Sequence, residues 1–273
     1  MFRRIILTTA SAVLLSACAN NPVQTTSIKT FNAVLEQDGT RTSLGSDLSV
    51  RWTEGDAITV FSGQPSGTTF EMASISDNGM TASFQGEIPS SSIYYAIYPA
   101  QEKATIFGDN ATICASIPSV QPAKAGSFAD NVNLSISKTD SDQLYFKNVG
   151  GLLGFTANGT DIVSAMLSAD EKDGGALSGD CYFGYSGDDL LIFPSEEYGR
   201  KNVTLEGAIK SGDKYYFVVY PGTYQNLKLV FTNSKGEVAE FTTDNELTVG
   251  RATCTNIGTF NISADRWRPL NPS

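Results

Sequence analysis

Apolar and polar residues alternate in short segments along most of the chain, and hardly any segment shows the period of a helix. Segments 70–75 and 80–84 flank the turn Asp77–Gly79, in which Asn-Gly supplies the positive φ angles of a tight hairpin. Equivalent pairs of segments flank two further turns: 48–53 and 57–62 around Glu54–Asp56, and 227–232 and 237–242 around Asn233–Gly236. Many short strands at regular spacing predict an all-β fold built from β-sandwiches.

A repeat is the strongest internal signal in the sequence. Residues 84–99 contain Gly-x-Ile followed by Tyr-Tyr-x-x-Tyr-Pro, and the same series, with one inserted residue, begins 121 positions later (205 − 84 = 121). We interpret the repeat as a duplicated domain, with two sandwiches in tandem. The tyrosine-rich segment is typical of a strand whose rings cover the core and which Pro ends, and a sugar-stacking platform is the alternative interpretation.

The boundary between the two domains is expected near residues 139–142, where Thr-Asp-Ser-Asp separates a strand from an apolar stretch. We therefore expect an N-terminal sandwich over residues 28–143, a C-terminal sandwich over residues 144–262 and a tail over residues 263–273. Aspartates in the turns near positions 140 and 170 lack the ligand spacing of a calcium loop. The sequence therefore predicts no metal site and no cofactor.

The beginning of the chain has the order of a secretory signal, with basic residues, an apolar stretch over residues 5–15 and small residues before Cys18. The apolar stretch is too short to span the hydrocarbon core of a bilayer. Leu-Ser-Ala-Cys at positions 15–18 resembles the lipobox of bacterial lipoproteins, which implies a diacylglyceryl group on the Cys sulfur and an acylated amino end, as with palmitate. We expect a signal peptide over residues 1–17, lipidation of Cys18 and a flexible tether over residues 18–27. An unmodified cleaved signal is the alternative.

Charge and composition exclude several classes of function. Without residues 1–17 the chain has 17 basic and 29 acidic residues, a net charge of −12 (17 − 29 = −12), which argues against nucleic acid and anionic membranes as partners. The absence of histidine removes Ser-His-Asp and Cys-His nucleophiles and His-ligated zinc. Asp and Glu are scattered over turns with no pair set apart for acid–base work, so we predict that the protein is not an enzyme.

Three cysteines follow Cys18, namely Cys114, Cys181 and Cys254, and none forms a Cys-x-x-Cys motif. We expect them to be small buried residues in strands. A disulfide between Cys181 and Cys254 stays open, because the spacing neither requires nor forbids it.

Further motifs occur in a defined order after the lipobox: residues 29–33 (Lys-Thr-Phe-Asn-Ala), 40–44 (Thr-Arg-Thr-Ser-Leu), 48–61 (with Trp-Thr-Glu-Gly-Asp), the tyrosine-rich strand, 117–121 (Ile-Pro-Ser-Val-Gln) and 247–251 (Leu-Thr-Val-Gly-Arg). This series covers roughly residues 28–262. It resembles the fimbrillin-like lipoproteins of Bacteroidetes-type bacteria, which belong to the type V pilin superfamily.

The resemblance implies two transthyretin-like β-sandwich domains and a structural role in a pilus, or fimbria, that supports cell adhesion. Subunits of this family reach the cell outer membrane as lipoproteins. An arginine-specific protease then removes the lipid and the first strand, and the vacated groove accepts a donor strand from the C-terminal segment of another subunit. The implied partners are other pilin subunits, the outer membrane through the lipid, and a host or bacterial surface ligand.

On this chain, the resemblance places the removable first strand at residues 28–36. Ile28, Phe31 and Val34 are expected to offer its apolar side chains, and Arg41 is the candidate for proteolytic processing. The alternative for Arg41 is an ordinary exposed turn arginine.

The C-terminal tail departs from the family pattern. Residues 265–272 contain two prolines, which cannot donate to a strand ladder, so a donor strand would lie mainly within residues 254–262 or use part of the tail. The roles of stalk, anchor and tip subunit therefore stay open. A surface lipoprotein that binds a glycan or a protein ligand without polymerising is the alternative function.

Overall fold

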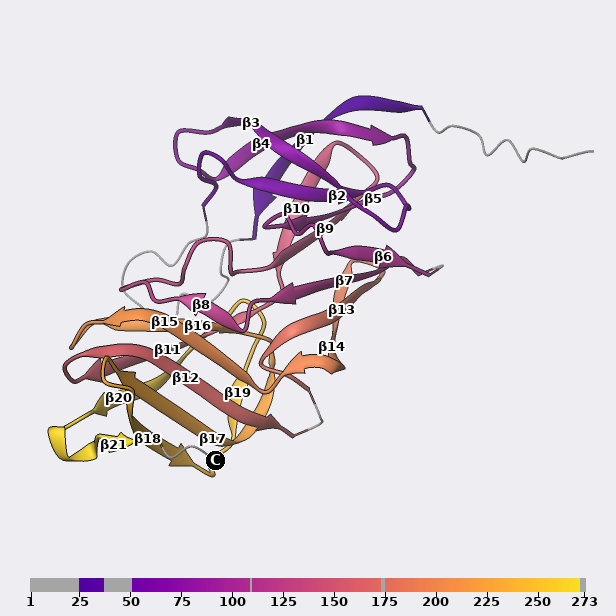
Figure 1. The fold of residues 1–273 in the computed structure, drawn as a ribbon. Helices are drawn as coiled ribbons and strands as arrows, with labels where there is room; N and C mark the ends of the chain where they lie inside the picture. The colour runs from indigo at the N-terminus through magenta and orange to yellow at the C-terminus, as the bar shows by residue number, and fades with distance from the viewer. Residues whose placement is uncertain (1–24, 37–50, 109, 173–174, 271–273) are drawn as a thin grey trace, which may run out of the picture.

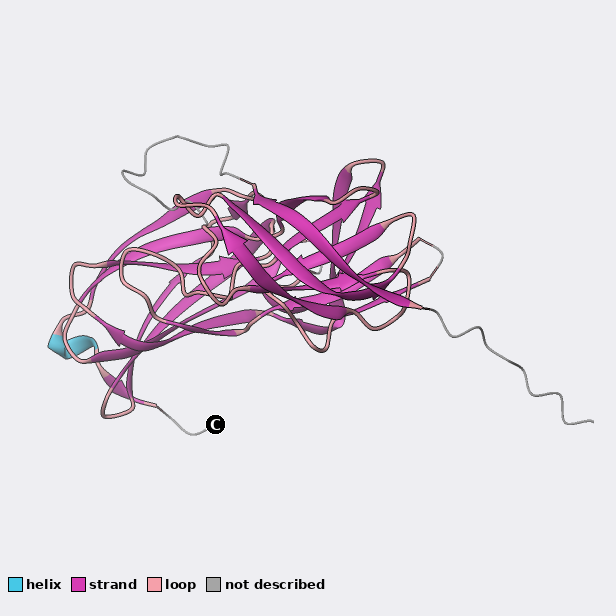
Figure 2. Cartoon of the chain, turned by 90° about the horizontal axis from the view of Figure 1, so that it is seen from above, coloured by secondary structure: helices cyan, strands magenta, loops and turns pink. Residues whose placement is uncertain are grey.

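The computed structural model describes residues 25–36, 51–108, 110–172 and 175–270, and almost all of these belong to β-sheets (Figure 1). The predicted all-β fold is confirmed. Within these ranges a single short turn of 3-10 helix, η1 (Ala264–Arg266), lies at one end of the molecule (Figure 2). No helix in the described ranges is long and apolar enough to cross a bilayer.

Seven strands form a closed barrel, in the upper part of Figure 1, in the order β1-β10-β9-β5-β2-β3-β4. Their bounds are β1 (Thr26–Leu35), β2 (Ala57–Phe61), β3 (Thr68–Ile75), β4 (Thr81–Pro89), β5 (Tyr94–Tyr98), β9 (Ser135–Thr139) and β10 (Gln143–Asn148). The buried Trp52 ring lies at the centre of the barrel core, edge-on to Phe84, Tyr98 and Phe146 at centroid distances of 4.9, 4.7 and 5.7 Å. Such edge-to-face packing is favourable for aromatic rings, so this cluster stabilises the barrel from inside.

Two further sheets face each other and enclose a second core, in the lower part of Figure 1. One sheet has the order β16-β11-β20 and the other β21-β18-β17-β12-β15-β8, with β19 paired to β17. Their bounds are β8 (Val120–Pro122), β11 (Gly151–Asn158), β12 (Ile162–Glu171), β15 (Asn202–Ile209), β16 (Lys214–Val219), β17 (Gly222–Asn233), β18 (Glu237–Thr243), β19 (Leu247–Val249), β20 (Cys254–Asn261) and β21 (Arg268–Pro269). Buried side chains of both sheets interdigitate, as the sequence prediction of a sandwich requires.

A four-stranded sheet lies between the barrel and the sandwich in Figure 1, in the order β14-β13-β7-β6. Its strands are β6 (Thr105–Phe107), β7 (Thr112–Ile117), β13 (Ser178–Ser186) and β14 (Asp189–Arg200). Buried residues of this sheet, of the barrel and of β11 and β16 share a third core. The barrel and the sandwich are therefore joined by continuous apolar packing.

Most of the strands expected from alternation are present, with one exception. The predicted hairpins at 70–84 and 227–242 correspond to β3–β4 and β17–β18, and the predicted strand at 57–62 corresponds to β2. Residues 51–53 are not a strand, although alternation predicted one over 48–53, whose first residues lie outside the described ranges. The Trp52 side chain turns inward there, and its backbone N–H donates a single hydrogen bond to the Gly79 carbonyl at 2.8 Å.

Strand pairing does not follow the domain boundary expected after residue 143. The strand that begins there, β10, pairs with β1 and β9 of the barrel. Conversely, β7 pairs with β13 and β8 pairs with β15, although both precede the expected boundary. The division into domains at 28–143 and 144–262 stays a prediction. These pairings show that strands from one side of the expected boundary belong to sheets formed mainly by strands from the other side.

Five of the six repeated tyrosines lie in the core, and Tyr95 is partly buried. Tyr94 and Tyr98 of the first copy are 4% and 6% exposed, and Tyr215, Tyr216 and Tyr220 of the second copy are 1%, 5% and 0% exposed. The interpretation as a core strand is therefore confirmed, and these five rings are not available as a sugar-stacking platform. The Tyr220 hydroxyl also donates to the Gly179 carbonyl at 2.8 Å and accepts from the Ile117 N–H at 2.9 Å, which ties β7 and β13 to the end of β16.

We predict that Tyr220→Phe lowers the free energy of unfolding by about 1–3 kcal/mol, because it leaves the buried Ile117 N–H and Gly179 carbonyl without that partner. Tyr145→Phe is the matched control, since the Tyr145 side chain is 66% exposed, and its effect should stay below about 0.5 kcal/mol. Urea unfolding of both variants provides the measurement. Equal stability of the two variants would contradict the role given to the Tyr220 hydroxyl.

Candidate functional site

The first strand, β1, closes the barrel by pairing on both of its edges. It runs antiparallel to β4 over nine residue pairs, from Thr26↔Pro89 to Val34↔Thr81. Its last part also runs parallel to β10, from Asn32↔Gln143 to Leu35↔Phe146. The facing edges of β4 and β10 are therefore joined to each other only through β1.

The inward face of β1 differs from the one expected from the sequence. Phe31, Ala33 and Leu35 are 0%, 0% and 2% exposed, as the alternation of a strand requires. Of the three residues expected to provide the apolar contacts, Phe31 is buried, whereas Ile28 is 67% exposed and Val34 is only partly buried. The expectation for Ile28 and Val34 was wrong because their spacing from Phe31 is three residues, and a strand turns such positions to the opposite face.

Phe31 anchors β1 in the barrel core. Its ring lies 5.6 Å from that of Phe70 and 5.2 Å from that of Tyr94, measured between centroids. The Lys29 ammonium sits 4.8 Å from the centroid of the Tyr94 ring and forms an ion pair with Asp142 at 2.7 Å. An aromatic side chain and a cation thus fix the middle of the strand, in addition to its backbone hydrogen bonds.

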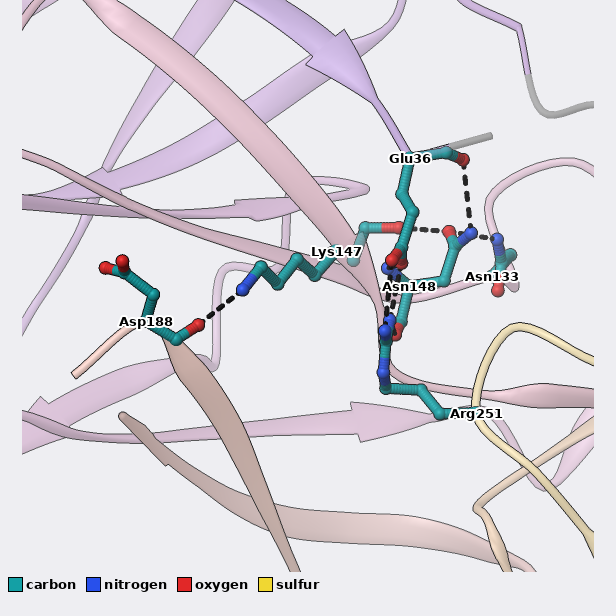
Figure 3. Close-up of polar contacts among 7 residues, drawn as sticks. Glu36, Asn133, Lys147, Asn148, Asp188 and Arg251 are labelled. Carbon is teal, nitrogen blue, oxygen red and sulfur yellow. Dashed lines mark hydrogen bonds and ion pairs between the residues drawn. The ribbon is translucent and has the colours of Figure 1, made fainter. Parts of the chain in front are cut away.

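Glu36, the residue directly after β1, forms a bidentate ion pair with Arg251 (Figure 3). Arg251 Nη1 donates to Glu36 Oε2 at 2.5 Å, and Arg251 Nη2 donates to Glu36 Oε1 at 3.0 Å. The backbone N–H of Asn148 donates to the same Oε2 at 2.9 Å. We call Glu36, Asn148 and Arg251 the Glu36 clamp. It connects the end of the first strand to a turn of the sandwich.

The sandwich side of the clamp is held by a tight turn between β19 and β20. Thr253 Oγ1 donates to the Gly250 carbonyl at 2.8 Å, and Ala252 adopts a positive φ of 52°. The turn lies so close to β11 that a Cβ added at Gly151 would be 2.3 Å from the Gly250 carbonyl oxygen. Glycine at position 151 therefore permits the approach that brings the Arg251 guanidinium to the end of β1.

The barrel side of the clamp is an amide network at the end of β10. Arg251 Nη1 also donates to the Asn148 carbonyl at 2.8 Å. The Asn148 side-chain oxygen accepts from Asn133 Nδ2 and Ser135 Oγ, both at 2.9 Å (Figure 3 shows the Asn133 bond). The hydrogen bonds that Arg251 donates to Glu36 are the largest cause that raises the pKa of Arg251 above its ordinary value. The clamp is thus a charged pair on a preorganised amide frame.

Two residues singled out in the sequence, Cys18 and Arg41, lie outside the described ranges. Arg41 belongs to the segment 37–50 that follows Glu36, so it comes directly after the clamp in sequence. Sequence reasoning did not identify Glu36 or Arg251 as site residues. They are 215 positions apart, and no local pattern indicates that they meet.

Other parts of the molecule offer weaker sites. The cavity of about 580 Å³ beside Asp56, Gln101 and Glu102 is open to solvent, and both polar and apolar residues line it. Among the described residues, no three His, Cys, Asp or Glu side chains lie together as metal ligands would.

The three cysteines beyond Cys18 are free thiols, so the disulfide left open between Cys181 and Cys254 is not formed in this structure. Cys181 is buried, as expected, and Cys114 and Cys254 are partly buried. Burial raises the pKa of the Cys181 thiol well above its ordinary value, which makes it a packing residue and not a nucleophile.

No protein-family model matches the chain, and a comparison with curated proteins gives no match either. Solved structures to which the chain is similar include a candidate cell adhesion protein from Bacteroides uniformis, with 16% identity, a TM-score of 0.47 and coverage of 88% of this chain and 96% of that one. A candidate cell adhesion protein from Bacteroides ovatus has 10% identity and a TM-score of 0.48, with coverage of 86% and 92%. The tip fimbrial protein Mfa3 from Porphyromonas gingivalis has 10% identity and a TM-score of 0.30, with coverage of 80% and 81%.

We predict that Glu36→Gln and Arg251→Gln each lower the free energy of unfolding by about 1–2 kcal/mol, because each leaves a partly buried charge or amide donor without its partner. The double variant should lose far less than the sum, with a coupling of about 1 kcal/mol in a double-mutant cycle by urea unfolding. The exposed pair Lys228–Glu240, with side chains 41% and 47% exposed, is the control and should show a coupling below about 0.5 kcal/mol. Additive effects at Glu36 and Arg251 would show that the ion pair between them contributes no stability.

Proposed function

We propose that this protein is a structural subunit of a surface fimbrium that assembles by strand exchange at the position of β1. The observation that carries the proposal is the double pairing of β1, which makes closure of the barrel depend on one terminal strand. The strand β1 is the first strand among the described residues, so a cut on its C-terminal side would separate it from every other strand described. The strand is therefore a replaceable part of the barrel.

Removal of β1 would expose two kinds of surface at once. The edges of β4 and β10 would present unpaired N–H and C=O groups, and the places of Phe31, Ala33 and Leu35 would become an apolar trench. Each surface is unfavourable in water, and an extended segment of another chain satisfies both together. In the proposed exchange, the incoming strand would be held by the same forces that keep β1 in place.

The processing step of the proposal links the lipid to assembly. Cys18 would carry the lipid that anchors the precursor in the cell outer membrane, and a cut at Arg41 would separate Cys18 and β1 from the rest of the chain. One cleavage would therefore release the anchor and free the groove. Because each subunit then offers a groove at one place and a donor at another, assembly is head-to-tail and gives an open filament.

The donor strand is expected from the C-terminal part of another subunit, within residues 254–262 or part of the tail. In this region β20 is an edge strand that pairs with β11 on one side, and β21 makes two register contacts with β18. An edge strand near the end of the chain costs less to detach than a central strand. This arrangement supports a subunit that both donates and accepts a strand.

We predict that an arginine-specific protease cuts the lipid-bearing protein after Arg41 and that ladders of covalently unlinked, SDS-resistant multimers follow. Mass spectrometry identifies the cut, and gel electrophoresis without boiling detects the ladders. Arg41 is the single basic residue within 37–50, so a cut inside this segment is assigned to it.

The matched controls are Arg41→Ala, which should stay lipid-bearing and monomeric, and Arg51→Ala, which should be cut and polymerise like the unaltered protein. Clean cleavage at Arg41 with monomers alone would contradict assembly of this chain with itself and would favour an anchor, a tip subunit or a ligand-binding lipoprotein. Ladders from Arg41→Ala would exclude Arg41 as the processing site.

A further inference from the structure

Removal of β1 would take Glu36 with it and leave three hydrogen-bond donors directed at one place. These donors are Nη1 and Nη2 of Arg251 and the backbone N–H of Asn148, which now hold the two oxygens of the Glu36 carboxylate. Arg251 does not depend on Glu36 alone for its position, because its Nη1 also donates to the Asn148 carbonyl. A planar guanidinium fixed in this way matches a carboxylate with two parallel bonds.

We propose that Arg251 and the Asn148 N–H form a carboxylate-binding site that selects the strand entering the groove and fixes its register. The strand that fits carries Asp or Glu directly after the last of its three inward residues. This inference rests on the proposed strand exchange and adds to it the chemistry by which the acceptor recognises its donor.

Backbone pairing alone does not fix the register of the incoming strand along β4. The ladder to β4 offers nearly identical hydrogen bonds wherever an extended segment is placed along it. A slip of one residue reverses the two faces of the strand, and a slip of two residues moves the carboxylate by about 7 Å, beyond the reach of Arg251. One charge at the end of the groove therefore distinguishes the correct placement from its neighbours.

The chain contains a second segment with the required pattern. Residues 30–36 are Thr-Phe-Asn-Ala-Val-Leu-Glu, and residues 259–265 are Thr-Phe-Asn-Ile-Ser-Ala-Asp. The first three residues are identical, and an acidic residue occupies the seventh position in both. After Phe31, the inward positions of β1 hold Ala33 and Leu35. The C-terminal segment has Ile262 and Ala264 at the corresponding positions, which is the same pair of side-chain sizes in reverse order. The total side-chain volume is therefore conserved, and only local repacking is needed.

In its own sheet, the C-terminal segment already alternates between buried and exposed side chains in the same order as β1. Phe260 is partly buried, Asn261 is exposed and Ile262 is 6% exposed, as Phe31, Asn32 and Ala33 are buried, exposed and buried in β1. The strand β20 also runs parallel to its partner β11, as β1 does to β10. Asp265 lies in η1, which buries no residue, so extending this turn costs little packing. A second copy of this chain therefore supplies a donor with a carboxylate for Arg251.

The test uses the full chain, cut at Arg41 by the arginine-specific protease, and a fluorescent peptide of residues 255–265. Fluorescence anisotropy measures binding of this peptide, of its Asp265→Asn form, and of its Asp265→Glu form. We expect the Asn form to bind about tenfold more weakly than the Asp form, since it loses the charge that pairs with Arg251. The Glu form should bind at least as tightly as the Asp form, because its length matches Glu36.

The protein variant Arg251→Gln should bind the Asp and Asn peptides equally, and Arg200→Gln, which removes an exposed arginine on β14, should keep the tenfold difference. The comparison of peptides on the unaltered protein needs no variant to fold. Equal binding of the Asp and Asn peptides would overturn the carboxylate site and leave strand exchange standing. Binding of neither peptide, with β1 retained after the cut, would overturn strand exchange and the donor role of the C-terminal segment with it.

Discussion

The ladder of hydrogen bonds along both edges of β1 is the constraint on which the barrel depends. The strand β1 is the first barrel strand in the chain, and it joins the edges of β4 and β10. Its inward residues, Phe31, Ala33 and Leu35, complete the core that surrounds Trp52. Loss of β1 would therefore open the barrel and remove three side chains from its core.

The Glu36 clamp shows how such a strand can be held firmly and still be released. The side chains of Glu36 and Arg251 are 29% and 34% exposed, so the pair avoids the full desolvation cost of a buried ion pair and is screened less than a surface pair. It lies where β1 ends, between the last residue of the strand and a turn of the sandwich. A cut after Glu36 leaves these bonds intact, and the strand then stays only through noncovalent contacts that another strand can replace.

Local sequence pattern predicted the parts of this fold that depend on neighbours along the chain. Alternation and turn residues predicted the hairpins β3–β4 and β17–β18, and the repeat predicted that the tyrosines of β5 and β16 are core residues. Pairings between distant segments were not accessible in the same way. The membership of β10 in the barrel, the pairing of β7 with β13, and the meeting of Glu36 with Arg251 depend on which strand edges lie side by side in space. The error at Ile28 and Val34 was of another kind, since a period of two, applied from Phe31, would have placed both on the outer face.

A strand that acts as a ligand presents mostly backbone, and backbone hydrogen bonds are the same for every sequence. Selectivity in such a groove must therefore come from the few positions where a side chain is confined or charged. In this barrel these positions are the aromatic site of Phe31, the confined site of Ala33 opposite Ala82, and the carboxylate site at Arg251. The sites of Phe31 and Ala33 favour apolar segments in general, and such segments are common in β-proteins. The charge at the end of the groove adds a requirement that few apolar segments meet, and it does so at the place where a shift in register has the largest electrostatic cost.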